Sequence, residues 1–234
     1  MSIQQKFSID QWDFKSESVL VNLPEEDKAI LLAHQTEQEY NKGEIIFREN
    51  SYPSGIFYVV KGKVKKYKID KNRKEHIIYV ANTGELIGFH AILSGDRFPD
   101  SAAALEKSII AFIPKEDFLQ ALAVSTLLST RLLKTLSHEF AVLANSLSII
   151  AQKSVRERLA LQLVVLSEKY KDHYAEGSTV EINMSRDDLA NLVGTARENV
   201  VRILSEFKAE GWLITKGRII IILDVDVLIK VANM

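Results

Sequence analysis

The chain has 234 residues, of which 47% are hydrophobic and 26% are charged, a balance typical of folded globular proteins and not of disordered chains. It contains no cysteine, which excludes disulfides, zinc fingers, cysteine-ligated iron–sulfur clusters and thiol redox sensors. The formal net charge is −1, so any affinity for nucleic acid has to come from the local arrangement of basic side chains.

No apolar run is long enough to span a bilayer, and Met1–Gln5 lacks the basic region and apolar core that begin a secretory signal. These features predict a cytoplasmic protein with no membrane partner. The first element with a clear start signal lies at Asn22-Leu23-Pro24. Here a cap residue, an early proline and first-turn acids predict a short amphipathic helix through about His34.

From Glu37 to Pro114 the sequence changes to short β-rich runs separated by turns that contain glycine. The runs are Glu44–Phe47, Ile56–Val60, Lys63–Ile69, His76–Val80 and Ser108–Ile113. Short strands separated by regularly spaced turns are typical of an antiparallel barrel or jelly roll. We interpret most of the glycines between the runs as turn residues.

A helical stretch at about Lys115–Ala123 leads into a longer helix whose apolar residues repeat at alternating steps of three and four. These residues are Leu133, Leu136, Phe140, Leu143, Leu147 and Ile150. They occupy heptad a and d positions over only two to three heptads. The pattern fits either a dimer seam or a helix that is buried within a single chain.

The register weakens at Ala151–Lys153, which predicts a hinge, and Ser154 can cap a new helix. A polar loop at Lys171–Thr179 and a short strand at Val180–Ile182 should follow. At the end of the chain, Asp224 is suited to cap a small helix that runs to about residue 231.

Two capping signals stand between this strand and the last hairpin. Ser185 with Asp188 predicts one helix, and Thr195 with Glu198 predicts a second that ends near residue 209. Gly194 lies between them and permits a sharp turn at positive φ. This is the pattern of a helix-turn-helix, although an ordinary helical hairpin carries the same signals.

The second of these helices has one apolar face, formed by Val200, Ile203, Leu204 and Phe207. If that face points inward, helical geometry places Arg197, Glu198 and Arg202 on the other side, near the N-terminal half. Arginine can bind N7 and O6 of guanine, and glutamate can accept from the amino group of cytosine. The three residues are therefore suited to read bases. The alternative interpretation is that they form an ordinary charged helix face exposed to solvent.

The residues after this helix favour the DNA-binding interpretation. A strand begins near Trp212, Lys216-Gly217 makes a turn, and a β-branched run returns from Arg218 to Leu223. Such a hairpin would be the wing of a winged helix. Lys216 and Arg218 at its tip are suited to contact flanking phosphates.

Ser185–Ile214 resembles the DNA-binding domain of the CRP/FNR family of bacterial transcription regulators. Arg197-Glu198 followed by Arg202 resembles the base-reading set of that family's catabolite-activator branch. The segments KGEIIF, YVVKGKVKKYK and GELIG resemble the β-roll of cyclic-nucleotide-binding domains, which is the sensory half of the family. The resemblance covers nearly the whole chain.

It implies an α+β protein with a β-roll sensor domain and N-terminal helix at 1–124, a dimerisation helix and hinge at 125–152, and a winged helix-turn-helix at 153–234. It also implies a homodimer on double-stranded DNA, with RNA polymerase as a further partner. The phosphate contacts that we expect are Ser185, Arg186, Thr195, Lys216 and Arg218. The heptad residues become the dimer seam, and Leu128 and Leu132 contact the roll of their own chain.

The sequence departs from the family where a cyclic nucleotide would bind. Cyclic-nucleotide binders place an arginine before a Ser or Thr and an Ala to pair with the cyclic phosphate, but here the tripeptide is Asp100-Ser101-Ala102. An aspartate would repel the anion. Around Val142-Leu143-Ala144 the long helix is apolar where the cyclic AMP sensor uses hydroxyls.

We therefore expect an effector other than cyclic AMP, in a pocket formed by Gly84, Glu85, Leu86, Ile87, Asp100 and Ser101. The sequence is equally consistent with Glu85 as a turn residue that contacts no effector. Two alternatives stay open. Arg97 supplies the missing charge if the loop alignment shifts, which gives a cyclic-nucleotide-responsive regulator, or the protein is an effector-independent constitutive activator.

A β-roll can also be a cupin enzyme, which would need clustered histidines and a glutamate around a metal. His76 and His90 are isolated in the roll, and no nucleophile–base pair, phosphate loop or paired carboxylates stand out. We expect no catalytic residue, no metal and no cofactor.

Overall fold

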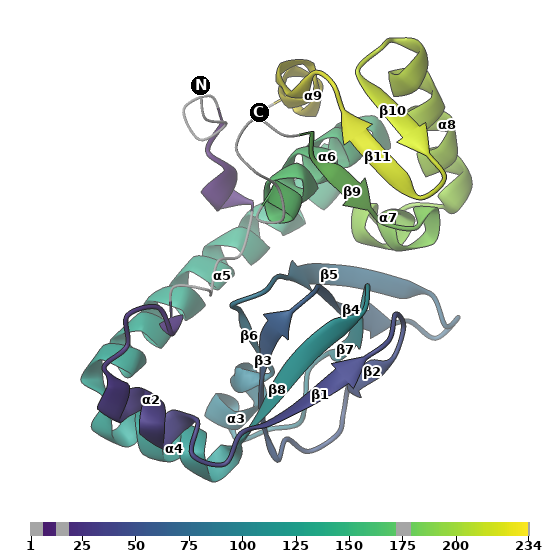
Figure 1. Ribbon diagram of the computed structural model, residues 1–234. Coiled ribbons are helices and arrows are strands. Elements are labelled where there is room, and N and C mark those ends of the chain that lie inside the picture. The colour runs from purple at the N-terminus through teal and green to yellow at the C-terminus, as the bar shows by residue number, and fades with distance from the viewer. Residues whose placement is uncertain (1–6, 13–18, 172–178, 234) are drawn as a thin grey trace. The chain divides into compact units, whose positions relative to one another are not determined.

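The structure is a computed structural model that describes residues 7–12, 19–171 and 179–233. The chain divides into two compact units, one of residues 14–140 and one of residues 1–13 with 141–234. The long helix α5 (Thr126–Gln152) contributes residues to both units (Figure 1). In the described part of the chain, no helix is long and apolar enough to cross a membrane.

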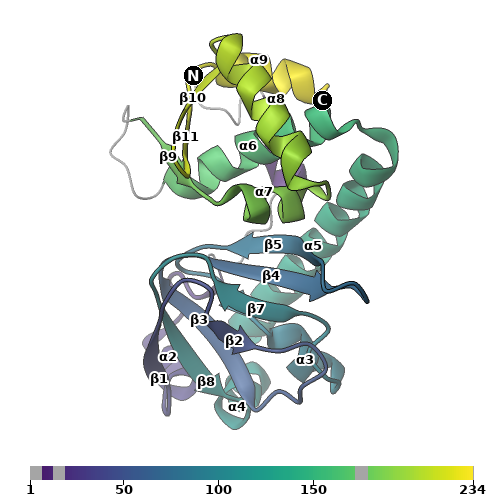
Figure 2. The same ribbon diagram turned by 90° about the vertical axis from the view of Figure 1, so that its right-hand side faces the viewer.

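Two antiparallel four-stranded sheets form the roll of the first unit (Figure 2). One sheet has the order β1 (Thr36–Tyr40), β8 (Ser108–Pro114), β3 (Gly55–Lys61), β6 (Leu86–Ile87). The other has the order β2 (Ile45–Phe47), β7 (Ser101–Ala104), β4 (Val64–Ile69), β5 (Glu75–Ala81). The predicted β-roll is confirmed, and all the strands expected from the sequence are present.

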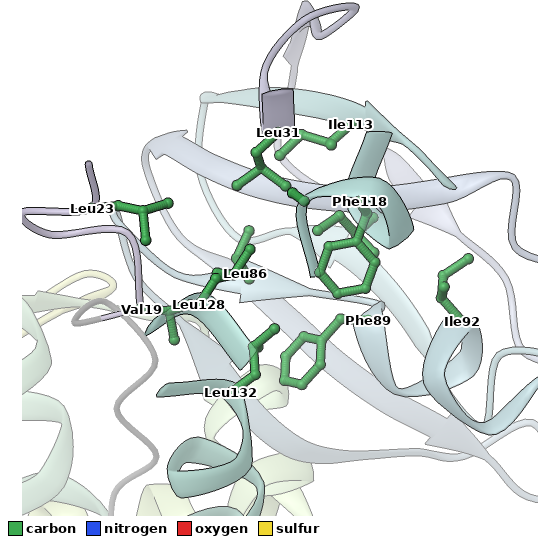
Figure 3. Close-up of a cluster of buried hydrophobic side chains, with 12 residues drawn as sticks. Val19, Leu23, Leu31, Leu86, Phe89, Ile92, Ile113, Phe118, Leu128 and Leu132 are labelled. Carbon is green, nitrogen blue, oxygen red and sulfur yellow. The ribbon is translucent and has the colours of Figure 1, made fainter. Parts of the chain in front are cut away.

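Among the described residues, four helices accompany the roll: α2 (Glu25–Leu31), α3 (Phe89–Ser94), α4 (Lys115–Val124) and the first half of α5. Their apolar side chains meet in one cluster with strand residues. Phe89 from α3, Phe118 from α4, and Leu128 and Leu132 from α5 are buried there together (Figure 3). The expected contact of Leu128 and Leu132 with the roll of their own chain is therefore confirmed.

The N-terminal helix is shorter than predicted and starts differently. Asn22 does not cap it as predicted: Asn22 has a φ of 53°, and the N-cap of α2 is Pro24, which makes no side-chain cap bond. The helix ends at Leu31 and not near His34. His34 instead lies outside the helix, and its backbone N–H donates to Asp117 Oδ2 of α4 at 3.0 Å.

The second unit contains α6 (Val155–Lys171), α7 (Arg186–Val193), α8 (Arg197–Ala209) and α9 (Val225–Ala232). A three-stranded sheet has the order β10 (Leu213–Lys216), β11 (Ile219–Ile222), β9 (Glu181–Asn183). A short 3-10 helix, η1 (Ile9–Gln11), also belongs to this unit. The predicted polar loop after Lys171 lies mostly outside the described residues.

The break between α5 and α6 falls at the predicted hinge. Ser154 precedes α6, accepts a hydrogen bond from Glu157 N at 3.3 Å and donates its own N–H to Glu157 Oε2 at 2.8 Å. This reciprocal pair is a capping box. The side-chain and backbone hydrogen bonds from Ser154 lower the pKa of the Glu157 carboxyl. Helix α6 therefore has a defined start directly after the break.

Candidate functional site

Helix α7 begins at the predicted cap. Ser185 Oγ accepts from Asp188 N at 3.0 Å and donates to Asp188 Oδ2 at 2.6 Å. The helix ends at Gly194, which has a φ of 72° and donates its N–H to Ala190 O. The left-handed conformation explains why a residue without Cβ stands there. The predicted first helix and its glycine turn are confirmed.

Helix α8 starts one residue later than predicted, and its expected cap is wrong. The N-cap is Ala196, which makes no side-chain cap bond, and not Thr195. Thr195 belongs to the turn, because its N–H donates to Ala190 O at 3.0 Å. Its side chain is nearly buried and accepts from Asn199 Nδ2 at 3.1 Å. The hydroxyl is thus directed to a side chain instead of a free backbone N–H.

The two faces of α8 are those predicted from its periodicity. Val200, Ile203, Leu204 and Phe207 are buried. Arg197, Glu198 and Arg202 are exposed, as a helix that enters a major groove requires. Val201 lies between them and is 44% exposed. Sequence reasoning missed this residue, although an apolar side chain off the buried face was its signal. Such a side chain suits contact with a thymine methyl group.

Both arginines on the exposed face have acidic partners within the unit. Arg202 Nη1 lies 2.5 Å from Glu206 Oε1, and Arg197 Nε lies 3.6 Å from Asp187 Oδ1. A guanidinium carries five N–H donors in a rigid fork, so one acidic partner leaves other donors available to a base.

Helix α6 holds the C-terminal half of α8 through Arg156. Its Nη1 donates to Glu206 Oε2 at 2.5 Å, and its Nη2 donates to Glu210 Oε2 at 3.0 Å. The guanidinium also lies 4.6 Å from the ring centroid of Phe207 and 5.4 Å from that of Trp212. Charged and cation–π contacts therefore converge on one side chain.

A second arginine of α6 holds the turn between α7 and α8. Arg158 Nε donates to Val193 O at 3.1 Å, and Nη2 donates to Gly194 O at 3.3 Å. Its Nη1 donates to Lys153 O at 3.0 Å, between α5 and α6. These acceptors are carbonyls at a helix C-terminus, which lack partners within the helix and favour a cation.

Strands β10 and β11 form the predicted wing beside α8 (Figure 1). Lys216 and Arg218 lie at the tip and are exposed. Arg186 of α7 donates to the carbonyls of Gly217 and Arg218 at 3.1 and 3.2 Å. Burial lowers the pKa of Arg186, but an arginine in this environment stays charged. Arg186 thus ties the wing tip to the first helix.

In the roll, the predicted effector residues around Glu85 form a tight turn. Glu85 is 2% exposed, and its Oε1 accepts from Asn82 N at 3.0 Å. Gly84 N donates to Val59 O at 2.8 Å, and Val59 N donates to Glu85 O at 2.9 Å. Leu86 and Ile87 follow in β6 and are buried. These contacts agree with the interpretation of Glu85 as a turn residue.

The other predicted effector residues also have protein partners. Asp100 is 4% exposed, and its Oδ2 lies 3.1 Å from Lys66 Nζ of β4, whose side chain is 12% exposed. Ser101 Oγ accepts from Glu49 N at 2.9 Å. Arg97 is exposed and donates to Asn50 O and Tyr52 OH at 3.2 and 3.1 Å.

Three phenylalanine rings cover the backbone that follows β6. The rings of Phe47 and Phe98 stack at 4.2 Å, and those of Phe47 and Phe57 at 5.4 Å. A Cβ on Gly88, whose φ is 83°, would lie 3.0 Å from the Phe98 ring. This part of the roll is filled by aromatic side chains.

The heptad residues of α5 differ in burial. Leu133, Phe140, Leu143, Leu147 and Ile150 are exposed. Leu136 packs on the cluster beneath the roll. Phe140 is 76% exposed, which is unusual for a side chain of its size. We call these five exposed residues the α5 stripe.

In the residues that the structure describes, no cluster of His, Asp and Glu could hold a metal ion.

A roll of two sheets, a long helix and a winged helix-turn-helix together define a DNA-binding transcription regulator with a separate sensor-like unit. Comparisons with known proteins agree. Residues 37–125 match the cyclic nucleotide-binding domain family, and residues 157–231 match the Crp-like helix-turn-helix domain family. The chain belongs to the CRP/FNR family of transcription regulators.

Its relatives are regulators and not enzymes. The fumarate and nitrate reduction regulatory protein of Escherichia coli K12 is 28% identical over 192 residues, which cover 82% of this chain and 76% of that protein. The same regulator from Vibrio cholerae is 28% identical over 193 residues, with 82% and 77% covered.

Solved structures show the same fold. FixK2 from Bradyrhizobium japonicum has a TM-score of 0.74 at 22% identity and covers 84% of this chain and 96% of its own. A CooA mutant from Carboxydothermus hydrogenoformans has a TM-score of 0.71 at 20% identity and covers 95% and 98%.

The Lys66–Asp100 pair generates a prediction about stability. Lys66→Met keeps an apolar side chain of similar length but leaves the Asp100 carboxylate buried without its ammonium, so unfolding should become easier by about 3–5 kcal/mol. Urea denaturation followed by circular dichroism measures this. Lys68→Met is the control, because Lys68 is 54% exposed and pairs with Glu49, and it should cost no more than about 1 kcal/mol. Equal small losses in both variants would contradict the prediction.

Proposed function

We propose that this regulator binds a two-fold-symmetric DNA operator as a homodimer and reads bases with Arg197, Glu198 and Arg202. The main support is the exposed polar face on the N-terminal half of α8, whose other face is buried. This arrangement leaves the three side chains accessible to a major groove. The resemblance of the trio to the catabolite-activator set leads us to expect inverted half-sites related to TGTGA, about one helical turn apart.

Phosphate contacts should position α8 without reading sequence. Lys216 and Arg218 at the exposed wing tip are the strongest candidates. Ser185, Arg186 and Thr195 remain candidates with a second role, because each also has a hydrogen-bonding partner within the unit. Arg186 would then act on the duplex both directly and by holding the wing.

Dimerisation through α5 is supported by the α5 stripe. Large apolar side chains at heptad spacing are exposed along a helix of 27 residues. Burial of such a stripe against a second copy removes apolar area from water and is the geometry of a two-helix seam. A two-fold dimer axis would match the inverted half-sites, since operator symmetry mirrors protein symmetry. RNA polymerase is the further partner that we propose at the promoter.

The first test separates base reading from phosphate binding. Arg197→Ala or Arg202→Ala should weaken binding to the preferred site by about 1–3 kcal/mol and relax the preference at one base pair. Lys216→Ala should weaken all sequences by a similar factor. Titrations with matched and substituted duplexes at one fixed salt concentration measure both effects. An unchanged preference in both arginine variants would rule out the assignment.

The second test concerns the dimer. Phe140→Glu combined with Leu143→Glu would bury two unpaired charges in the proposed seam, a cost large enough to compete with assembly. Sedimentation analysis should then show monomers. Ala141→Glu combined with Ser148→Glu is a matched control, because both residues are exposed and lie off the seam on the same helix. A dimer that persists in the first variant would exclude this interface.

The proposed effector is not cyclic AMP. An anion that approached Asp100 would meet a buried carboxylate already paired with Lys66. Arg97, the alternative phosphate ligand, is exposed and directed to Asn50 and Tyr52. Regulation would then come from another small molecule that shifts the dimer between conformations, or from protein level alone in a constitutive activator.

Isothermal titration with cyclic AMP and cyclic GMP tests this part of the proposal. We expect no saturable heat with either nucleotide, because Lys66 is already paired with Asp100 and Arg97 is directed to Asn50 and Tyr52. Micromolar binding that Arg97→Ala abolishes would instead identify an ordinary cyclic-nucleotide receptor. Lys107→Ala is a suitable control for charge removal, since Lys107 is exposed and pairs with Glu39, which is also exposed.

A further inference from the structure

We propose that Glu206 is a positioning residue for base recognition, which fixes the guanidinium of Arg202 and links it to helix α6. This inference rests on the proposed base-reading role of Arg202. It assigns to Glu206 no contact with DNA. The consequence would be that discrimination at one base pair depends on a carboxylate one helical turn away from the arginine that reads it.

The carboxylate of Glu206 is shared between two arginines. Its Oε1 lies 2.5 Å from Arg202 Nη1, and its Oε2 lies 2.5 Å from Arg156 Nη1. The Glu206 side chain is 37% exposed, whereas that of Arg202 is 62% exposed. Because each oxygen serves a different partner, the carboxylate cannot rotate toward one arginine without loss of the other bond. Glu206 therefore has a defined orientation.

Arg156, which fixes the orientation of Glu206, is itself held by several contacts. Besides Glu206, it binds Glu210 and lies over the rings of Phe207 and Trp212. Its guanidinium is thus held by two carboxylates and two aromatic faces, in the first turn of α6. The chain of contacts runs from α6 through Glu206 to Arg202 on the exposed face of α8.

This geometry affects recognition in two ways. An arginine that is already ordered loses less side-chain freedom when it binds guanine, so more of the interaction appears as discrimination. The negative charge of Glu206 also lies on the DNA-binding helix, where it opposes phosphate groups of any sequence. Glu206 would therefore raise specificity while it lowers affinity for non-specific DNA.

The test is Glu206→Gln, which keeps the size of the side chain but removes the charge and one acceptor. Its matched control is Glu210→Gln, because Glu210 also binds Arg156, whereas the carboxylate that contacts Arg202 belongs to Glu206. Affinities are measured for the preferred duplex and for one substituted at the base that Arg202 reads. Five dimers are compared at one salt concentration: wild type, the two Gln variants, Arg202→Ala, and Arg202→Ala with Glu206→Gln.

We expect Glu206→Gln to lower the preference ratio on the order of threefold to tenfold, the range of effects that ordering one long side chain produces. Affinity for the substituted duplex should stay the same or rise. Glu210→Gln should keep the wild-type ratio. In the Arg202→Ala background, Glu206→Gln should have no further effect on the ratio, since its action requires Arg202.

Failure of this inference can be told apart from failure of the proposed function. If Arg202→Ala lowers the ratio and Glu206→Gln does not, base reading by Arg202 stands and the positioning role is wrong. If Arg202→Ala leaves the ratio unchanged, the base-reading assignment itself is wrong. Equal losses in both Gln variants, or an added loss in the double variant, would mean that Glu206 acts through the fold and would overturn the inference.

Discussion

The first turn of α6 fixes the geometry of the unit that carries the recognition helix. Arg156 contacts the C-terminal half of α8, and Arg158 binds carbonyls at the end of α7 and in the glycine turn. Both arginines belong to one helical turn, so α7 and α8 are tied to α6 rather than only to each other. The capping box of Ser154 fixes the start of α6 directly before these two arginines.

Sequence patterns predicted the parts of this unit that depend on local periodicity. The buried and exposed faces of α8 follow from helical spacing, and the wing follows from a Lys-Gly turn between β-rich runs. The cap at Thr195 was wrong because the same local signal is compatible with a turn residue whose hydroxyl binds Asn199. Strands β1, β6 and β7 were not predicted, for a related reason. Strand β1 is mostly exposed, β6 has only two residues and β7 consists of small residues, so none of them shows alternation. All three exist through pairing with distant strands.

Long-range ion pairs were beyond the reach of sequence reasoning. Glu206 and Arg156 are 50 residues apart, and nothing in the local sequence of either residue indicates the other. The partner of Asp100 could not be predicted either. The sequence shows that an acid stands where the family places a basic residue, but it does not show that this acid pairs with Lys66 of β4. Charge pairs of this kind depend on which strands and helices become neighbours, and that is settled by the tertiary fold.

The Lys66–Asp100 pair has a consequence for the chemistry that the roll can admit. A carboxylate that belongs to the chain is present at a fixed stoichiometry and cannot be diluted away, unlike a diffusible anion. A molecule that separated the pair would have to offer a negative group to Lys66 and a donor or positive group to Asp100, because either charge left alone in a buried position is costly. A zwitterion that reached this position would therefore be opposed less than a simple anion, because it could offer a partner to each charge.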